Sequence, residues 1–182
     1  IAVYCASSMQ IDDSFFRDAR QLGRLMGEKG LTLVNGAGNM GLMAESANGC
    51  LEAGGKAIGI IPTFMIEEGW CHNGMTEIIE TTDMHVRQAK MAEMSDAGIF
   101  LPGGCGTFAE MMELITWKQL GLYLKPIVFL NTNGYFDPEQ VVFAGQNADL
   151  RGAGACFMLD KVQREFQIFP GGSSIVLHPQ PQ

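Results

Sequence analysis

The sequence predicts an α/β fold in which a doubly wound parallel sheet is covered by helices on both faces. Short apolar or β-branched runs alternate with longer segments of helical period along most of the chain. This order is typical of parallel sheets whose strands are connected by helices. The chain has 182 residues, which lies in the usual size range of one domain, so we expect residues 1–182 to form a single domain.

The expected strands and helices follow one another in order. The strands are expected at residues 1–5, 31–35, 56–62, 76–81, 97–102 and 125–131, and the helices near residues 13–29, 41–53, 83–97 and 106–121. The stretch from about 150 to 182 changes character, with the segments GAG, PGG and HPQPQ. No element is assigned to that stretch.

Composition and charge exclude several classes of partner. Hydrophobic residues make up 47% of the chain and charged residues 18%, which is a globular composition. The net charge of −8 and the pI near 4.8 argue against a nucleic acid polymer or a membrane surface, because both need a basic face. No apolar run reaches the ~20 residues of a membrane span. Any bound anion must therefore be held locally.

The cysteines argue against disulfides and metal. They lie at positions 5, 50, 71, 105 and 156, and no CxxC pair occurs. The pattern therefore suggests neither a disulfide framework nor a zinc site, and we expect no metal. Free cysteines fit a reducing compartment, so a cytoplasmic location is expected.

Ligands of parallel α/β sheets bind beyond the carboxyl ends of the strands. This rule selects four loops, at residues 5–8, 35–41, 61–64 and 101–107. Ser8 and Gly38 are the candidate substrate-binding residues of the first two. The segment GAGNMG, from Gly36, matches the dinucleotide-binding pattern GxGxxG, but the next strand ends at Pro62 without the acidic residue that would hold a ribose. A nicotinamide cofactor is therefore disfavoured, and a tight turn with close backbone packing is an equal alternative.

The loop LPGGCGT has the features of an anion site. Gly103, Gly104 and Gly106 leave backbone N–H groups unshielded where a helix is expected to begin, near Thr107. The first N–H groups of a helix are unpaired and carry the positive end of its dipole. A terminal phosphate fits such a site. Cys105 is interpreted as a small loop residue rather than a nucleophile, because the sequence places no histidine to serve it.

Glu110 has two interpretations. With Thr107 it has the spacing of a capping box, in which both side chains bond to the first turn of the helix. Alternatively Glu110 acts on a ligand. A phosphate bound one turn away would repel its carboxylate, and Gln would serve a capping box as well. Helix stability alone therefore does not explain why this position is Glu. Glu110, Glu113 and Trp117 share one helical stripe, and Trp117 is expected to pack.

Arg87 falls inside an apolar stripe formed by Met84, Met91 and Met94. Because a buried guanidinium needs a partner, Arg87 either pairs with an acid or projects into a site for an anion. The sequence leaves both possibilities open. The 12 methionines have two interpretations, an adaptable pocket wall or soft core packing, and core packing is favoured.

Three segments resemble the LOG family, which was long labelled as lysine decarboxylases. They are NGAGNMGLM (35–43), MHVRQAKM (84–91) and LPGGCGTFAEMMELITWKQLG (101–121). The resemblance, from about residue 3 to 143, implies a Rossmann-like homodimer with its active site near the subunit interface. It implies hydrolysis of the N-glycosidic bond of a nucleoside 5′-monophosphate, such as AMP or a cytokinin riboside monophosphate, to free base and ribose 5-phosphate. No cofactor is implied.

The resemblance also assigns residues. It places the essential arginine and glutamate on Arg87 and Glu110, and a threonine that lines the substrate on Thr116. The expected phosphate-loop residues are Gly103, Gly104, Cys105, Gly106 and Thr107. The chain departs from the family pattern in three places. Gln88 stands where a substrate-contacting Lys is usual, Ala37 interrupts a triple glycine, and Ala44 replaces a common Gly.

A mechanism follows as a hypothesis. Cleavage of a ribose–base bond passes through an oxocarbenium-like state, which Glu110 would stabilise through the sugar hydroxyls or by activating water. The loop amides would hold the phosphate, and Arg87 the phosphate or the departing base. Glu113 and Glu67 or Glu68 are candidates for a second carboxylate. The alternative is a non-catalytic nucleotide-binding module of the same fold.

Overall fold

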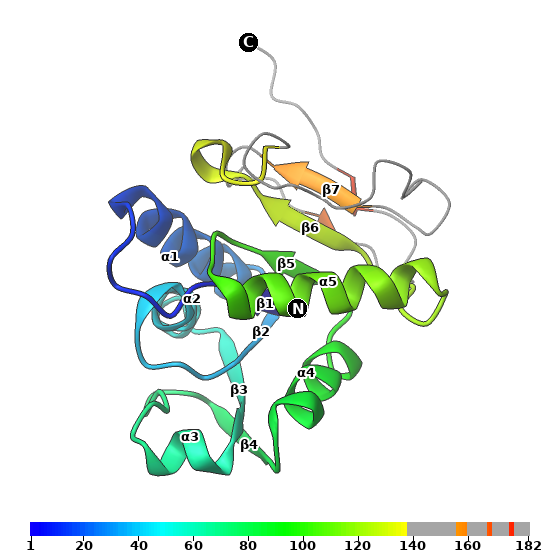
Figure 1. The fold of residues 1–182 in the computed structure, drawn as a ribbon. Helices are drawn as coiled ribbons and strands as arrows, with labels where there is room; N and C mark the ends of the chain where they lie inside the picture. The colour runs from blue at the N-terminus through cyan, green and yellow to red at the C-terminus, as the bar shows by residue number, and fades with distance from the viewer. Residues whose placement is uncertain (138–155, 160–166, 169–174, 177–182) are drawn as a thin grey trace.

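The computed structural model describes residues 1–137, 156–159, 167–168 and 175–176. Its main strands are β1 (Ala2–Tyr4), β2 (Thr32–Asn35), β3 (Lys56–Pro62), β4 (Glu77–Thr81), β5 (Gly98–Phe100), β6 (Ile127–Leu130) and β7 (Cys156–Leu159). They form a seven-stranded sheet in the order β4-β3-β2-β1-β5-β6-β7 (Figure 1). Every neighbouring pair in this sheet is parallel. The predicted parallel α/β fold is confirmed.

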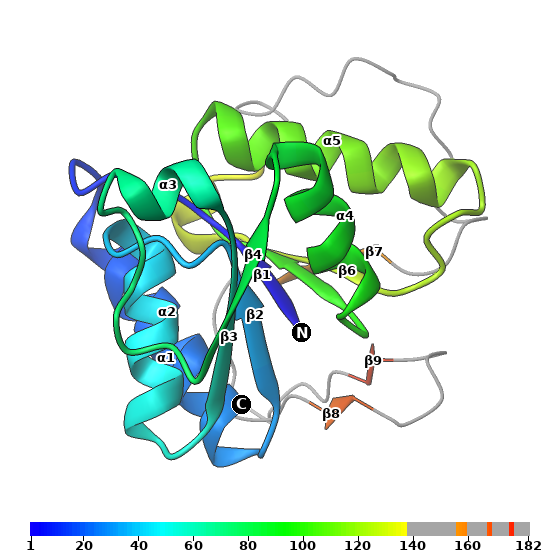
Figure 2. The same ribbon diagram turned by 90° about the horizontal axis from the view of Figure 1, so that it is seen from below.

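Helices cover both faces of the sheet, as predicted. They are α1 (Asp13–Glu28), α2 (Gly41–Glu52), α3 (Thr63–Glu67), α4 (Met84–Glu93) and α5 (Cys105–Gln119), followed by the short 3-10 helix η1 (Thr132–Gly134). Helices α1 and α2 lie on one side of the sheet, and α4 and α5 lie on the other (Figure 2).

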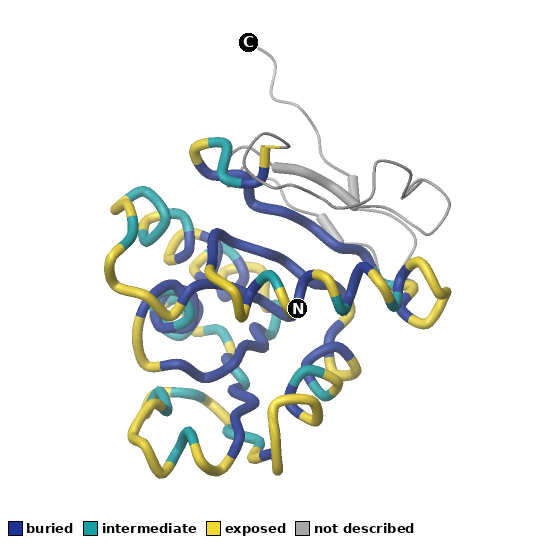
Figure 3. Tube along the Cα trace, viewed as in Figure 1, coloured by how far each residue is buried: buried dark blue, intermediate teal, exposed yellow. Residues whose placement is uncertain are grey.

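The core is divided by the sheet into two apolar layers. Along β1, Val3 packs in the layer that includes residues of α1 and α2, whereas Ala2 and Tyr4 pack in the layer that includes residues of α4 and α5. Successive side chains of a strand point to opposite faces, so a sheet buried on both sides needs apolar residues at every position. Strands β1, β2, β5 and β6 are accordingly almost entirely buried, whereas in the outer strand β4 only Thr81 is buried (Figure 3).

The strand order creates a crevice between β1 and β5. From β1 the chain adds β2, β3 and β4 outward on one side, and β5 then returns to the other side of β1. Connections from β1 and β5 therefore leave in opposite directions, which separates the loops at their carboxyl ends. Parallel α/β sheets bind ligands at such a switch point.

Several boundaries differ from those predicted. A short helix, α3, follows Pro62 where only a loop was expected, the helix expected at 83–97 ends at Glu93, and that expected at 106–121 begins earlier, at Cys105. The stretch 150–182 lies outside the described residues except for β7 and the antiparallel pair β8 (Gln167–Ile168) and β9 (Ile175–Val176). Among the described helices, none combines the length and apolarity that a membrane crossing requires.

Candidate active site

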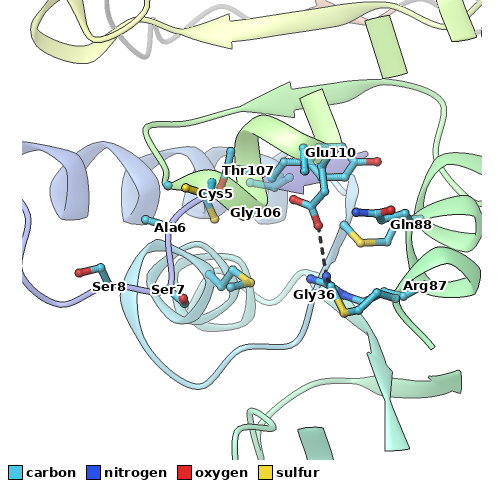
Figure 4. A pocket seen from close by; sticks show the side chains of 18 of the residues that line it. Cys5, Ala6, Ser7, Ser8, Gly36, Arg87, Gln88, Gly106, Thr107 and Glu110 are labelled. Carbon is cyan, nitrogen blue, oxygen red and sulfur yellow. Dashed lines mark hydrogen bonds and ion pairs between the residues drawn. The ribbon is translucent and has the colours of Figure 1, made fainter. Parts of the chain in front are cut away.

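A pocket of about 470 Å³ opens at the crevice between β1 and β5. Figure 4 shows residues from several separate segments converging on it. Its lining comes from β1 and the loop after it, the loop after β2, α2, α3, α4, and α5 with the glycine before it. The lining residues are Val3, Tyr4, Cys5, Ala6, Ser7, Ser8, Gly36, Met43, Met65, Met84, Arg87, Gln88, Met91, Gly104, Cys105, Gly106, Thr107, Ala109 and Glu110.

The start of α5 forms one wall of this pocket. Gly104 is the N-cap residue, and no side chain caps the helix. By helix geometry, the N–H groups of the first turn have no acceptor within the helix. Gly104 and Gly106 are exposed, and a Cβ atom on either would meet no atom within 4 Å. The amides of this turn are therefore open to a ligand, as an anion site requires.

The capping-box interpretation of Glu110 is wrong. Because α5 begins at Cys105, Thr107 is already the third helical residue and cannot be the N-cap. The carboxylate of Glu110 instead accepts a hydrogen bond from Arg87, with 3.2 Å between Oε1 and Nη1. The pair is drawn as the dashed line in Figure 4. Glu110 is therefore placed by tertiary contact with α4, not by the local turn.

Of the two alternatives predicted for Arg87, pairing with an acid is confirmed, and a role at an anion stays a prediction. The Arg87 side chain also lines the pocket. It projects from α4, whose N-cap Asp83 accepts from the N–H groups of His85 and Val86. Its Nε donates to the carbonyl of Ile60 at 3.1 Å, at the end of β3. The guanidinium is thus held from two sides.

The Arg87–Glu110 ion pair is almost fully buried, with side-chain exposures of 6% and 9%. Burial raises the pKa of the Glu110 carboxyl, the Arg87 guanidinium lowers it, and the nearby Glu113 raises it; the net direction is upward. Arg87 and Glu110 are the only Arg, Lys, Asp or Glu among the described lining residues. The pocket wall thus combines a partly desolvated carboxylate with a single cation and a set of amides.

Sequence comparison gives the family. A family model described as possible lysine decarboxylase matches residues 40–149. A probable cytokinin riboside 5′-monophosphate phosphoribohydrolase of Oryza sativa subsp. japonica is 41% identical over 143 residues, which cover 79% of this chain and 64% of that protein. A cytokinin riboside 5′-monophosphate phosphoribohydrolase of Rhodococcoides fascians is 41% identical over 139 residues, which cover 76% of this chain and 70% of the relative. The chain belongs to the LOG family.

The fold also resembles proteins outside the LOG phosphoribohydrolases. The molybdenum cofactor carrier protein of Chlamydomonas reinhardtii superposes with a TM-score of 0.68 at 23% identity, over 88% of each chain. At this identity the likeness concerns the fold alone. The LOG fold therefore serves proteins with different ligands, and the function must be argued from the site.

The structure brings together most, but not all, of the expected site residues of this LOG protein. Ser8, Gln88, Gly104, Cys105, Gly106 and Thr107 line the pocket with Arg87 and Glu110, whereas Gly38, Gly103 and Thr116 do not. Thr116 is exposed, and its hydroxyl donates to the carbonyl of Met112 at 2.7 Å. Gly103 is buried, and its carbonyl accepts from the hydroxyl of Tyr135 at 2.6 Å.

The candidates for a second carboxylate do not reach the pocket. Glu67 and Glu68 are exposed at the end of α3, and Glu113 is absent from the lining. Glu113 acts on Glu110 only through its charge. Trp117 packs against the core, as expected. Among the described residues, no cluster of three or more His, Cys, Asp or Glu is placed to hold a metal ion.

Met43, Met65, Met84 and Met91 line the pocket, so the less favoured of the two methionine interpretations, a pocket wall, holds for these four. Sequence reasoning missed two other features of the pocket. Gly36 lies directly against Arg87. Cys5 lines the inner wall, where burial raises the pKa of its thiol far above the usual range and keeps it protonated. Methionine spacing also fits a buried helix face, so periodicity alone does not separate the two roles.

Proposed function

We propose that this chain hydrolyses the N-glycosidic bond of a nucleoside 5′-monophosphate and releases the free base and ribose 5-phosphate. The observation that carries the proposal is the buried Arg87–Glu110 pair on the pocket wall, one turn from the open amides of α5. The phosphoribohydrolase names of relatives at about 41% identity support the same chemistry. AMP and cytokinin riboside monophosphates are the substrates we expect.

The chemistry requires an anion beside the ribose. As the C–N bond breaks, the sugar acquires oxocarbenium character and water attacks C1′. Glu110 supplies the negative charge, either through the sugar hydroxyls or by activating the water. The raised pKa of Glu110 makes its carboxylate a stronger base, and the Arg87 guanidinium opposes protonation of that carboxylate. We assign to Arg87 a contact with the phosphate or the departing base.

The phosphate is assigned to the start of α5. The N–H groups of Cys105, Gly106 and Thr107 have no acceptor within the helix and would bond to the phosphate, and the helix dipole favours an anion at this end. A 15-residue helix such as α5 is long enough for that dipole to develop. Binding energy from the phosphate would hold the ribose in the orientation required for cleavage.

A lysine decarboxylase activity does not fit the pocket. Pyridoxal phosphate enzymes of that type hold their cofactor through a lysine Schiff base and place an acid at the ring nitrogen. Among the described residues that line the pocket, none is a lysine. We therefore derive no step through that cofactor.

The proposal is tested by incubating the protein with AMP, with a prenylated AMP and with a panel of other nucleoside monophosphates. Free base is measured by chromatography, and ribose 5-phosphate by an enzyme-coupled assay. Equal amounts of both products are expected from at least one nucleotide. Nucleotide binding by calorimetry without product from any nucleotide would reject hydrolysis and favour the non-catalytic binding module.

A homodimer is proposed as the assembly. Helices α4 and α5 carry exposed apolar side chains beside the pocket, including Val86 at 45% and Met112 at 43% exposure. Clustered apolar exposure of this kind marks interaction surfaces. Thr116 lies one turn beyond Met112 on the same exposed face of α5, so a role for Thr116 at substrate would require a second copy. A cytoplasmic location remains a prediction.

A further inference from the structure

Gly36 lies under the guanidinium of Arg87, immediately after β2. A Cβ atom on Gly36 would lie 1.7 Å from Nη2 of Arg87, 2.8 Å from its Cζ and 3.2 Å from its Nε. These separations mean that the guanidinium fills the volume that any side chain at position 36 would need. The backbone of Gly36 is not among those with positive φ, so its conformation does not by itself require glycine.

The turn around Gly36 is held firmly in place. The side chain of Asn35 is fully buried; its Oδ1 accepts from Ala37 N–H at 2.8 Å, and its Nδ2 donates to the carbonyl of Met43 at 3.0 Å. Ala37 has a φ of 55°, a conformation that a residue with a Cβ adopts only when its surroundings enforce it. The carbonyl of Ala37 also accepts from His72 N–H at 2.8 Å. A methyl group at position 36 would therefore displace the arginine rather than the turn.

We propose that Gly36 is a positioning residue whose missing side chain provides the space in which Arg87 reaches Glu110. Without that space, the guanidinium cannot bond both the Ile60 carbonyl and the Glu110 carboxylate. Asn35 contributes indirectly by fixing the turn on which Gly36 is carried. The catalytic consequence rests on the proposed function, whereas the placement of Arg87 is independent of it.

The test is Gly36→Ala, compared with Gly74→Ala. Gly74 lies outside the pocket, and its added Cβ would also approach side-chain atoms alone, Cε1 of His72 at 3.0 Å, Nδ1 of His72 at 3.5 Å and Cδ1 of Leu51 at 3.9 Å. We expect Gly36→Ala to lower kcat/KM for base release at least tenfold, and Gly74→Ala to leave it within twofold. In Gly36→Ala the acidic limb of the pH profile should also move to higher pH, because the displaced guanidinium no longer lowers the pKa of Glu110. An unchanged rate and pH profile in Gly36→Ala would overturn the proposal.

A double variant separates this role from a general effect on folding. In an Arg87→Ala background the guanidinium is absent, so Gly36→Ala should cause no further drop in melting temperature. If Gly36→Ala lowers the melting temperature equally in both backgrounds, Gly36 serves only the turn and the inference fails. The comparison of melting temperatures in the two backgrounds needs no turnover. It therefore still tests the role of Gly36 if no nucleotide is hydrolysed, and that result would reject only the proposed function.

Discussion

Replacing Glu110 by glutamine tests the centre of the proposed mechanism. The amide keeps the size of the side chain and one oxygen to accept from Arg87, but it removes the negative charge. A hydrogen bond to a charged group contributes about 1.5–3 kcal/mol, against about 0.5–1.5 kcal/mol for a neutral pair. Removing one partner of a buried ion pair outright costs about 3–5 kcal/mol. With both exposures below a tenth and one acceptor retained, we expect a loss of about 1–3 kcal/mol.

That loss corresponds to a fall in melting temperature of roughly 2–12 °C for a chain of this size. Base release should fall by about 10² or more, because the charge opposite the oxocarbenium is gone. Calorimetry and chromatographic detection of the base measure the two effects. The double variant Arg87→Gln/Glu110→Gln removes both charges and should melt above Glu110→Gln while staying inactive. Full activity of Glu110→Gln would refute the catalytic role, and no recovery in the double variant would refute the energetic coupling.

Three further predictions concern the surroundings of the pair. Because the Glu113 carboxylate raises the pKa of Glu110, Glu113→Gln should move the acidic limb of kcat/KM to lower pH; an unmoved limb would mean that this limb does not report Glu110. Tyr135→Phe removes the hydroxyl bonded to Gly103 and should raise the KM for nucleotide several-fold while lowering stability by about 0.5–1.5 kcal/mol, and an unaltered KM would show that the loop needs no such support. Met112→Asp places a charge in the exposed apolar face of α5 and should give a monomer in light scattering, whereas a persistent dimer would locate the interface elsewhere.

The fold was predictable because each strand is a compact apolar run bounded by turn residues. A segment such as KAIGIIP, which forms β3 from Lys56 to Pro62, fits a buried strand better than a helix or a loop in a chain of this composition. Helix ends were harder to predict. The helix at α5 begins at Cys105 because Gly104 serves as its N-cap, and the more favoured capping residue, Thr107, suggested a later start.

The site was predictable where loops follow strands, and less so where distant segments meet. The rule on carboxyl ends located the loop 101–107, and the need of a buried guanidinium for a partner raised the possibility of an acid near Arg87. Choosing Glu110 as that acid required the α4–α5 contact, since 23 positions separate the two residues in sequence. The role of Gly36 was also hidden, because glycine in a turn is usually explained by the backbone.

The amide wall at the start of α5 has an evolutionary consequence. A binding element made of main-chain groups cannot be deleted by exchanging any single side chain, and it does not titrate between pH 4 and 10. Met43, Met65 and Met84, which also line the pocket, carry flexible thioethers that tolerate replacement. If the α5 amides hold the sugar phosphate as proposed, descendants of such a protein can change which nucleobase they accept and keep the phosphate site unchanged.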